Sequence, residues 1–143
     1  MPIDWSRTEG QKGILGMNRD LIALRRNLPG VTRGLCGQNI HIYHVDNGAK
    51  LIAFHRWDKQ GPTDSVVVAV NMTKQNRDGC VIGFPRAGLW KTRFSSDSFN
   101  YGRDLSNHPA PDVEAHEEKS GGLPSSGKIN IGPYTAVIYS QDV

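Results

Sequence analysis

Histidines are the residues of this chain that most readily suggest a metal site, since the sequence contains five of them. Three of these, His41, His44 and His55, lie in two strand-like runs separated by Asn47-Gly48. Asn-Gly between such runs indicates a hairpin with a two-residue turn. That turn puts His44 and His55 on one face, roughly 13 Å apart at about 3.3 Å per residue, and directs His41 to the other face. Because zinc needs its ligands around a single ion, we expect no metal site.

Catalysis by acids, bases or nucleophiles would need a recognisable group of side chains, and the sequence offers none. Gly-x-Ser-x-Gly, a phosphate-binding glycine loop and HExxH are all absent. Cleavage or transfer of a glycosidic bond requires a pair of carboxylates. The acidic residues fall in turns and in a polar segment, residues 95–127, and no spacing singles out a pair. We therefore predict no catalytic residue and no cofactor.

Flat aromatic rings are a second functional feature, because sugar-binding surfaces stack such rings against the apolar faces of pyranose units. Trp57 ends a strand-like run, and Phe99 and Tyr101 lie in the polar segment. These three residues are the candidates for substrate binding. Large aromatic side chains are mostly buried, so a core position is the alternative for Trp57, and Trp90 is expected in the core.

The length and the charge of the chain limit the classes of protein that it can represent. At 143 residues it fits one domain and is too short for a barrel enzyme of roughly 250 residues. Its 17 basic residues are scattered among 14 acidic ones, which argues against a nucleic-acid partner. No apolar run approaches a membrane span. The two cysteines, Cys36 and Cys80, lack metal or disulfide spacing, which favours reduced thiols and a cytoplasmic location.

The hydrophobic period changes at Pro29-Gly30. Before this point, apolar residues three and four apart predict one helix over residues 14–28: Ile14, Met17, Leu21, Leu24 and Leu28. After it, short apolar or alternating runs predict strands near residues 40–45, 51–57, 65–71, 81–84, 89–94, 128–131 and 134–139. We expect an all-β, Greek-key-like antiparallel sandwich over 31–143, with 65–71 central and a hairpin around 85–88. The polar segment is functional, partly strand-forming or mobile.

The order of several segments resembles a known family. Asp4-Trp5-Ser6 and the run from Arg19 to Arg26 are similar to the last helix of a catalytic (β/α)8 barrel. Four further runs, 50–57, 66–71, 82–90 and 131–139, are similar to strands of an all-β domain that follows such a barrel. Together they resemble the α-amylase superfamily, and most closely the 1,4-α-glucan (glycogen) branching enzymes. The resemblance implies that residues 1–30 are the last barrel helix with a flexible lead-in, and that 31–143 are the C-terminal domain.

The resemblance implies a non-catalytic chain, because the family's catalytic residues lie in barrel segments that are not present. Asn107-His108-Pro109 does not match the family's Asn-His-Asp motif, since proline replaces the aspartate. The implied partner is the catalytic barrel of the same parent chain, which this domain would stabilise. Two alternatives are a module that binds α-glucan weakly and a free-standing sandwich with a protein partner. Without a barrel, the helix stripe should fold back fully onto the sandwich or pair with a second copy in a homodimer.

Overall fold

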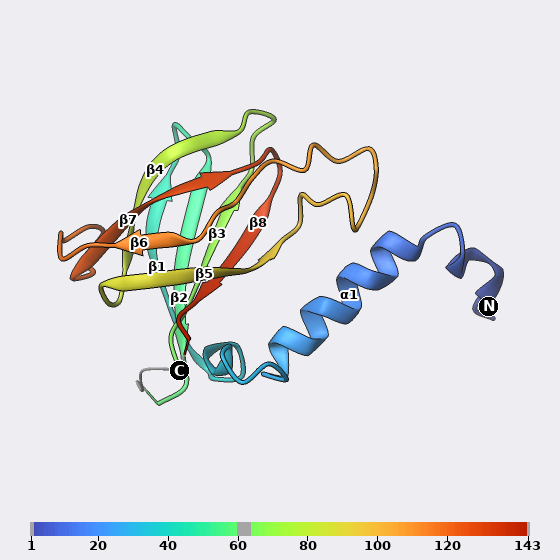
Figure 1. Cartoon of the computed structure of the whole chain (residues 1–143), viewed down its shortest axis with the longest axis horizontal. Helices are drawn as coiled ribbons and strands as arrows, with labels where there is room; N and C mark the ends of the chain where they lie inside the picture. The colour runs from blue at the N-terminus through green and yellow to red at the C-terminus, as the bar shows by residue number, and fades with distance from the viewer. Residues whose placement is uncertain (1, 60–63, 143) are drawn as a thin grey trace.

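A computed structural model describes residues 2–59 and 64–142 of the chain (Figure 1). Two short 3-10 helices and one α-helix occupy the N-terminal part: η1 (Trp5–Thr8), α1 (Lys12–Arg25) and η2 (Arg33–Leu35). The strands follow: β1 (Asn39–Asp46), β2 (Leu51–Trp57), β3 (Val66–Asn71), β4 (Arg77–Phe84), β5 (Gly88–Ser95), β6 (Val113–Ala115), β7 (Ser125–Ile131) and β8 (Ala136–Ser140). The expected class, an antiparallel all-β domain preceded by one α-helix, is confirmed.

Two antiparallel sheets make up the β-domain. The larger has six strands in the order β1-β2-β3-β8-β5-β6, and the smaller pairs β4 with β7. An isolated bridge between His116, just after β6, and Ser126 of β7 links the two sheets at one edge. β3 lies inside the larger sheet, as its uniformly apolar run predicted.

The core between the sheets forms from alternate residues of both. Trp90 and Tyr139 of the larger sheet pack with Phe84 of the smaller one, and their side chains are fully buried. The ring centroids of Phe84 and Trp90 are 5.1 Å apart. A second cluster lies on the outer face of the larger sheet, where Val66, Phe94 and Ile138 meet Leu24 of α1. The helix therefore covers part of the sheet face that points away from the smaller sheet.

The prediction of a hairpin around residues 85–88 is wrong. β4 pairs with β7, whereas β5 pairs with β6 and β8, so the chain changes sheets at this turn. The polar segment is partly strand-forming, because it contains β6 and the start of β7.

The hairpin expected around Asn47-Gly48 is confirmed, because β1 pairs antiparallel with β2, but its connection is not a two-residue turn. Asp46 pairs with Leu51, so four residues connect the strands, and the residue with a left-handed backbone is Lys50, with φ 54°. The Asp46 carboxylate accepts a hydrogen bond from the Ala49 amide at 2.9 Å. An aspartate at this position favours such a side-chain turn over the tighter Asn-Gly turn.

A bulge at Tyr43 places His41 on a different face of the sheet from the one that the sequence predicts. The register of β1 on β2 shifts between Ile42 and His44. Because the extra residue reverses the alternation of faces, His41 lies opposite His55, on the same face, and not on the other face as expected. His44 and His55 do share a face, since His44 pairs with Ala53, two residues before His55.

The helix begins and ends earlier than predicted, at Lys12 and Arg25 instead of residues 14 and 28. Asn27 ends the helix, because its backbone is left-handed (φ 54°) and its side chain accepts a hydrogen bond from the Thr32 amide at 2.8 Å.

The apolar stripe of the helix does not fold back fully onto the sandwich. Its middle residues Met17, Leu21 and Leu24 pack there, but Ile14 and Leu28 are exposed. The flexibility expected of the lead-in stays a prediction.

Candidate functional site

A contact between α1 and the segment after β5, residues 96–112, joins the helix to the sandwich; we call it the helix junction. The Tyr101 hydroxyl donates a hydrogen bond to the Asp20 carboxylate at 2.6 Å, and the Tyr101 ring packs on Phe94 with centroids 5.7 Å apart. Burial and this hydrogen bond both raise the pKa of the Tyr101 hydroxyl above its usual value. Gly13 permits the close approach, because a Cβ there would overlap the Tyr101 carbonyl. The junction thus adds a side-chain and a backbone contact to the packing of Leu24 on the sheet.

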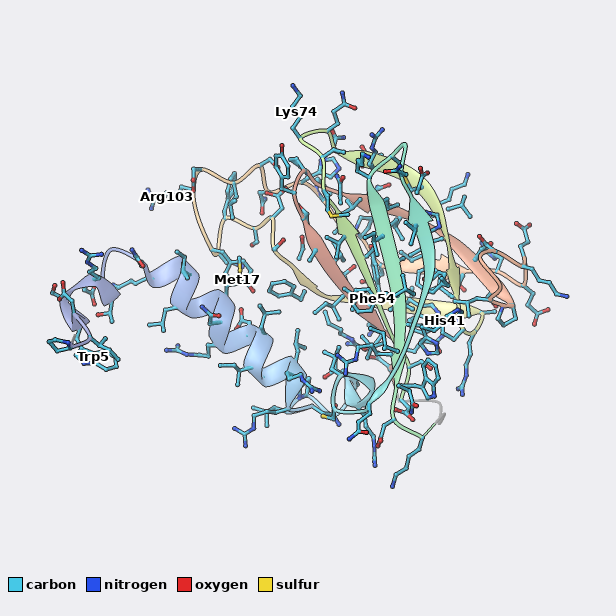
Figure 2. All side chains as sticks on the ribbon, turned by 180° about the vertical axis from the view of Figure 1, so that it is seen from behind. Trp5, Met17, His41, Phe54, Lys74 and Arg103 are labelled. Carbon is cyan, nitrogen blue, oxygen red and sulfur yellow. The ribbon has the colours of Figure 1, made fainter. Side chains whose placement is uncertain are left out.

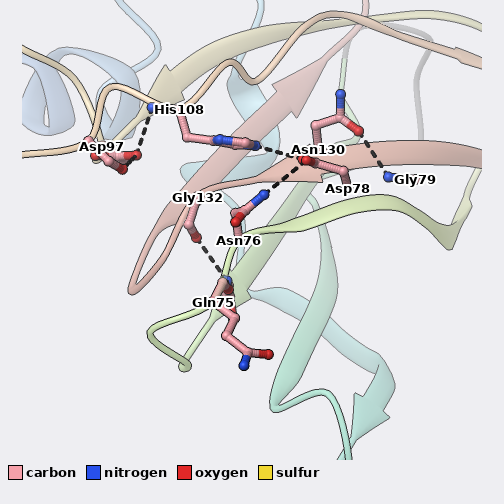
Figure 3. A network of polar contacts seen from close by, with 10 residues as sticks. Gln75, Asn76, Asp78, Gly79, Asp97, His108, Asn130 and Gly132 are labelled. Atoms are coloured by element: carbon pink, nitrogen blue, oxygen red, sulfur yellow. Dashed lines mark hydrogen bonds and ion pairs between the residues drawn. The ribbon is translucent and has the colours of Figure 1, made fainter.

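Asp97 holds the segment that carries Tyr101 (Figure 3). Its buried carboxylate accepts hydrogen bonds from the Ser106 hydroxyl at 2.5 Å and from the amides of Asn107 and His108 at 3.0 and 2.8 Å. Burial raises the pKa of Asp97, but these hydrogen bonds outweigh it and hold the pKa below its usual value. His108 in turn contacts Asp78 of β4 at 2.6 Å. The network ties the loop to the smaller sheet.

A cavity of about 450 Å³ opens beside the helix junction, and its lining combines apolar, cationic and anionic side chains: Asp20, Ala23, Leu24, Leu28, Pro29, Arg93 and Tyr101. Arg93 is mostly engaged, because it donates to the Ser140 hydroxyl at 2.8 Å and to the Asp142 carboxylate at 2.6 Å. Tyr101 is engaged with Asp20. These contacts make the cavity a structural junction with little unsatisfied hydrogen-bonding capacity.

The other apolar feature of α1 is its outer face, made of Ile14, Leu15 and Ile22, all of which are exposed. Trp5 of η1, 72% exposed, lies close by, and a cleft of about 300 Å³ separates η1 from the start of the helix. Figure 2 shows Met17 on the side of the helix that faces the loop, whereas Trp5 lies far from the sandwich. These exposed apolar side chains make this face of the helix a candidate interaction surface.

Trp57, the first of the predicted sugar-binding residues, ends β2 at the other end of the sandwich from residue 95. It is half-buried and stacks on His55, with ring centroids 4.6 Å apart and planes inclined by 28°. The Nε2 atom of His55 lies 3.1 Å from the Ser65 hydroxyl. Burial, followed by the nearby His41, lowers the pKa of His55 to about 4. This ring stack therefore includes a histidine that is neutral at pH 7.

The structure does not bring the three candidates together. Tyr101 is committed to the helix junction, Phe99 is 56% exposed on the same loop, and Trp57 lies on β2. Sequence reasoning missed Tyr134, a 71% exposed aromatic residue in the turn between β7 and β8. The signal that could have found it was its place directly after Gly132-Pro133, which indicates a turn and not the start of a strand.

Metal and membrane features are absent from the part of the chain that the structure describes. Within residues 2–59 and 64–142, no three His, Cys, Asp or Glu side chains are arranged to hold a metal ion. No helix among these residues has the length and apolar character needed to cross a membrane.

Comparison with known proteins agrees with this architecture. The 1,4-alpha-glucan branching enzyme GlgB of Rhodospirillum rubrum is 31% identical over 144 residues, which cover 99% of this chain and 18% of that enzyme. GlgB 2 of Xanthomonas oryzae pv. oryzae is 31% identical over 104 residues, covering 70% of this chain and 14% of that enzyme. The chain thus spans less than a fifth of the length of these relatives.

Solved structures share the fold. An alpha-amylase from H. orenii superposes with a TM-score of 0.53 at 17% identity, over 97% of this chain and 22% of the other. A trehalulose synthase mutant superposes equally well, at 19% identity. The family model described as "Alpha amylase, C-terminal all-beta domain" matches residues 41–142, from within β1 to beyond β8. The chain therefore belongs to the alpha-amylase C-terminal all-beta domain family.

Proposed function

We propose that this chain is the non-catalytic C-terminal module of a 1,4-α-glucan branching enzyme or a related α-amylase-family enzyme, and that it stabilises the catalytic barrel. In this proposal residues 1–30 supply the last barrel helix and residues 31–143 the sandwich. The relatives that it matches are named as enzymes of 1,4-α-glucan, and more than four fifths of their length lies outside the match. A cytoplasmic location stays a prediction.

The observation that carries the proposal is the two-sided apolar character of α1. Leu24 and Met17 pack against the sandwich, whereas Ile14, Leu15 and Ile22 on a neighbouring face are exposed. Burying one such side chain is worth roughly 1.5–3 kcal/mol. A helix that buries one apolar stripe while a neighbouring stripe stays exposed has apolar surface left over for a second contact. The second body here is the rest of the parent enzyme.

A chimera tests the proposal. The matched segment of the Rhodospirillum rubrum enzyme is replaced by this chain, and Ile22→Asp is introduced into the chimera and into the isolated chain. Ile22 is 57% exposed in the isolated chain, so the substitution should change its free energy of unfolding by no more than about 0.5 kcal/mol. In the chimera we expect a loss of about 2 kcal/mol or more, because a charge enters a buried contact.

Val81 provides the matched control. It is an apolar residue with 47% exposure on β4, in the sheet that α1 does not cover. Val81→Asp should therefore have the same small effect in both proteins. If Ile22→Asp is equally harmless in the chimera, the outer face of α1 does not dock on the barrel. If light scattering shows that the isolated chain is a dimer dissociated by Ile22→Asp, a second copy covers this face.

A further inference from the structure

Tyr134 combines an exposed aromatic side chain with an unfavourable backbone conformation. Its side chain is 71% exposed, and its backbone lies in the left-handed region at φ 47°. Non-glycine residues avoid this region because the Cβ crowds the backbone. Such conformations persist where the surrounding structure enforces them, and they cluster at functional sites.

Backbone hydrogen bonds hold the Tyr134 turn, independently of the Tyr134 ring. The Tyr134 amide donates to the Thr73 carbonyl at 2.9 Å, and the next amide, of Thr135, donates to the Asn71 carbonyl at 3.1 Å. The buried Asn71 side chain also donates to the Gly132 carbonyl at 2.8 Å. The ring therefore projects into solvent from a rigid turn, as a preorganised platform would.

A cavity of about 270 Å³ adjoins this ring, between the turn and the loop that follows β5. Leu105 and Pro133 give it apolar walls, and Asp104 and Ser106 give it polar ones. Asp104 has no hydrogen-bond or ion-pair partner within residues 2–59 and 64–142, whereas Asp97 at the base is saturated by the loop. An exposed carboxylate is thus available beside an exposed aromatic ring, and the Ser106 oxygen, whose hydrogen is donated to Asp97, can still accept a hydrogen bond.

The chemistry of this lining selects an uncharged polyhydroxylated ligand. The cavity contains no lysine, arginine or histidine but two aspartates, which disfavours phosphates and other anions. Carboxylate and hydroxyl oxygens accept hydrogen bonds from sugar hydroxyls, and an aromatic face packs on the apolar face of a pyranose ring. We propose that Tyr134 and Asp104 form an α-1,4-glucan subsite on this module. The choice of glucan rests on the proposed function.

The test is a titration of the isolated chain with maltoheptaose, followed by nuclear magnetic resonance shifts of backbone amides. A single shallow subsite should bind with a dissociation constant on the order of 1 mM. Tyr134→Ala should weaken binding at least tenfold, and Tyr134→Phe, which keeps the ring, should stay within about twofold of the parent. Asp104→Asn should weaken it by about three- to tenfold, because the acceptor loses its charge.

Further variants distinguish sugar binding by Tyr134 from a role of its ring in folding and from a glucan site elsewhere. Tyr134→Gly removes the left-handed strain, so its melting temperature should not fall although binding is lost; a clear fall would mean that the ring serves the fold. Trp57→Ala and Phe99→Ala should leave the affinity unchanged, and binding lost through either of them alone would place the glucan site there. No binding of maltoheptaose, or full binding by Tyr134→Ala, overturns the subsite. The Ile22→Asp chimera test measures docking without sugar, so the two proposals fail separately.

Discussion

Gly13 and Tyr101 approach each other so closely that an ideal Cβ on Gly13 would overlap the Tyr101 carbonyl oxygen. Gly13 lies in the first turn of α1, and Tyr101 belongs to the loop that follows β5. The contact places backbone against backbone, so no side-chain rotation can relieve an added methyl group. The close approach of the start of α1 to this loop therefore depends on a glycine.

We expect Gly13→Ala to lower the free energy of unfolding by about 1–3 kcal/mol, because an added methyl group in a packed contact forces the backbone to shift. Gly16 is the matched control, since nothing lies within 4 Å of its ideal Cβ. Gly16→Ala should raise the stability by up to about 1 kcal/mol through helix propensity. Urea denaturation of both variants measures the difference, and equal gains in both would contradict the close contact.

Asp97→Asn should release the loop from the sandwich. The substitution removes a charge that accepts three hydrogen bonds in a buried position, and we expect a loss of about 3 kcal/mol. Trypsin should then cleave after Arg103 faster than in the parent chain. Glu117→Gln, which changes an exposed carboxylate, is the control for lost charge. Unchanged cleavage at Arg103 in Asp97→Asn would show that the loop is held by other contacts.

The sequence predicts the class of fold and most strand positions, because alternation and β-branched runs report on burial locally. It did not predict which strands pair. Residues around Pro85 look like a hairpin turn, yet β4 and β5 belong to different sheets, since pairing depends on contacts distant in sequence such as β4 with β7. The bulge at Tyr43 was equally hidden, because a single extra residue leaves no mark on the composition of the run.

The candidate site was predicted less well than the fold. The apolar run that includes Tyr134 predicts a strand from residue 134, whereas β8 begins at Ala136 and leaves Tyr134 exposed in the turn. The aromatic ring makes Tyr101 a candidate, but its hydroxyl binds Asp20 of the helix, and no local sequence pattern indicates this contact. Exposure of an aromatic residue is a property of the assembled sheets.

His55 should make the stability depend on pH between about 4 and 6.5. Its pKa in the folded chain is about 4, lowered from 6.5, so the unfolded chain binds more protons in this window. The contribution of His55 to stability is then fully present above about pH 6.5 and is lost as the pH decreases towards 4. Thermal unfolding at a series of pH values measures the slope, and His55→Gln should flatten it. If His116→Gln, which removes an exposed histidine, flattens the slope equally, His55 is not responsible.

The connection between β1 and β2 gives a test that separates the observed four-residue turn from the two-residue Asn-Gly turn. A two-residue turn of that kind needs a left-handed Gly48, so Gly48→Ala would be costly. In the structure the left-handed residue is Lys50, and the ideal Cβ of Gly48 lies 3.4 Å from an Asp46 carboxylate oxygen, with no contact closer than this.

We therefore expect Gly48→Ala to change the free energy of unfolding by no more than about 0.5 kcal/mol. Lys50→Gly should raise it by up to about 1 kcal/mol, because glycine adopts the left-handed conformation without strain. Asp46→Ala should lower it by about 1 kcal/mol through loss of the hydrogen bond to the Ala49 amide. Urea denaturation measures all three variants. A large loss of stability in Gly48→Ala, together with no gain in Lys50→Gly, would show that the two-residue turn is the correct one. The pairing of His41 with His55 would then be wrong as well.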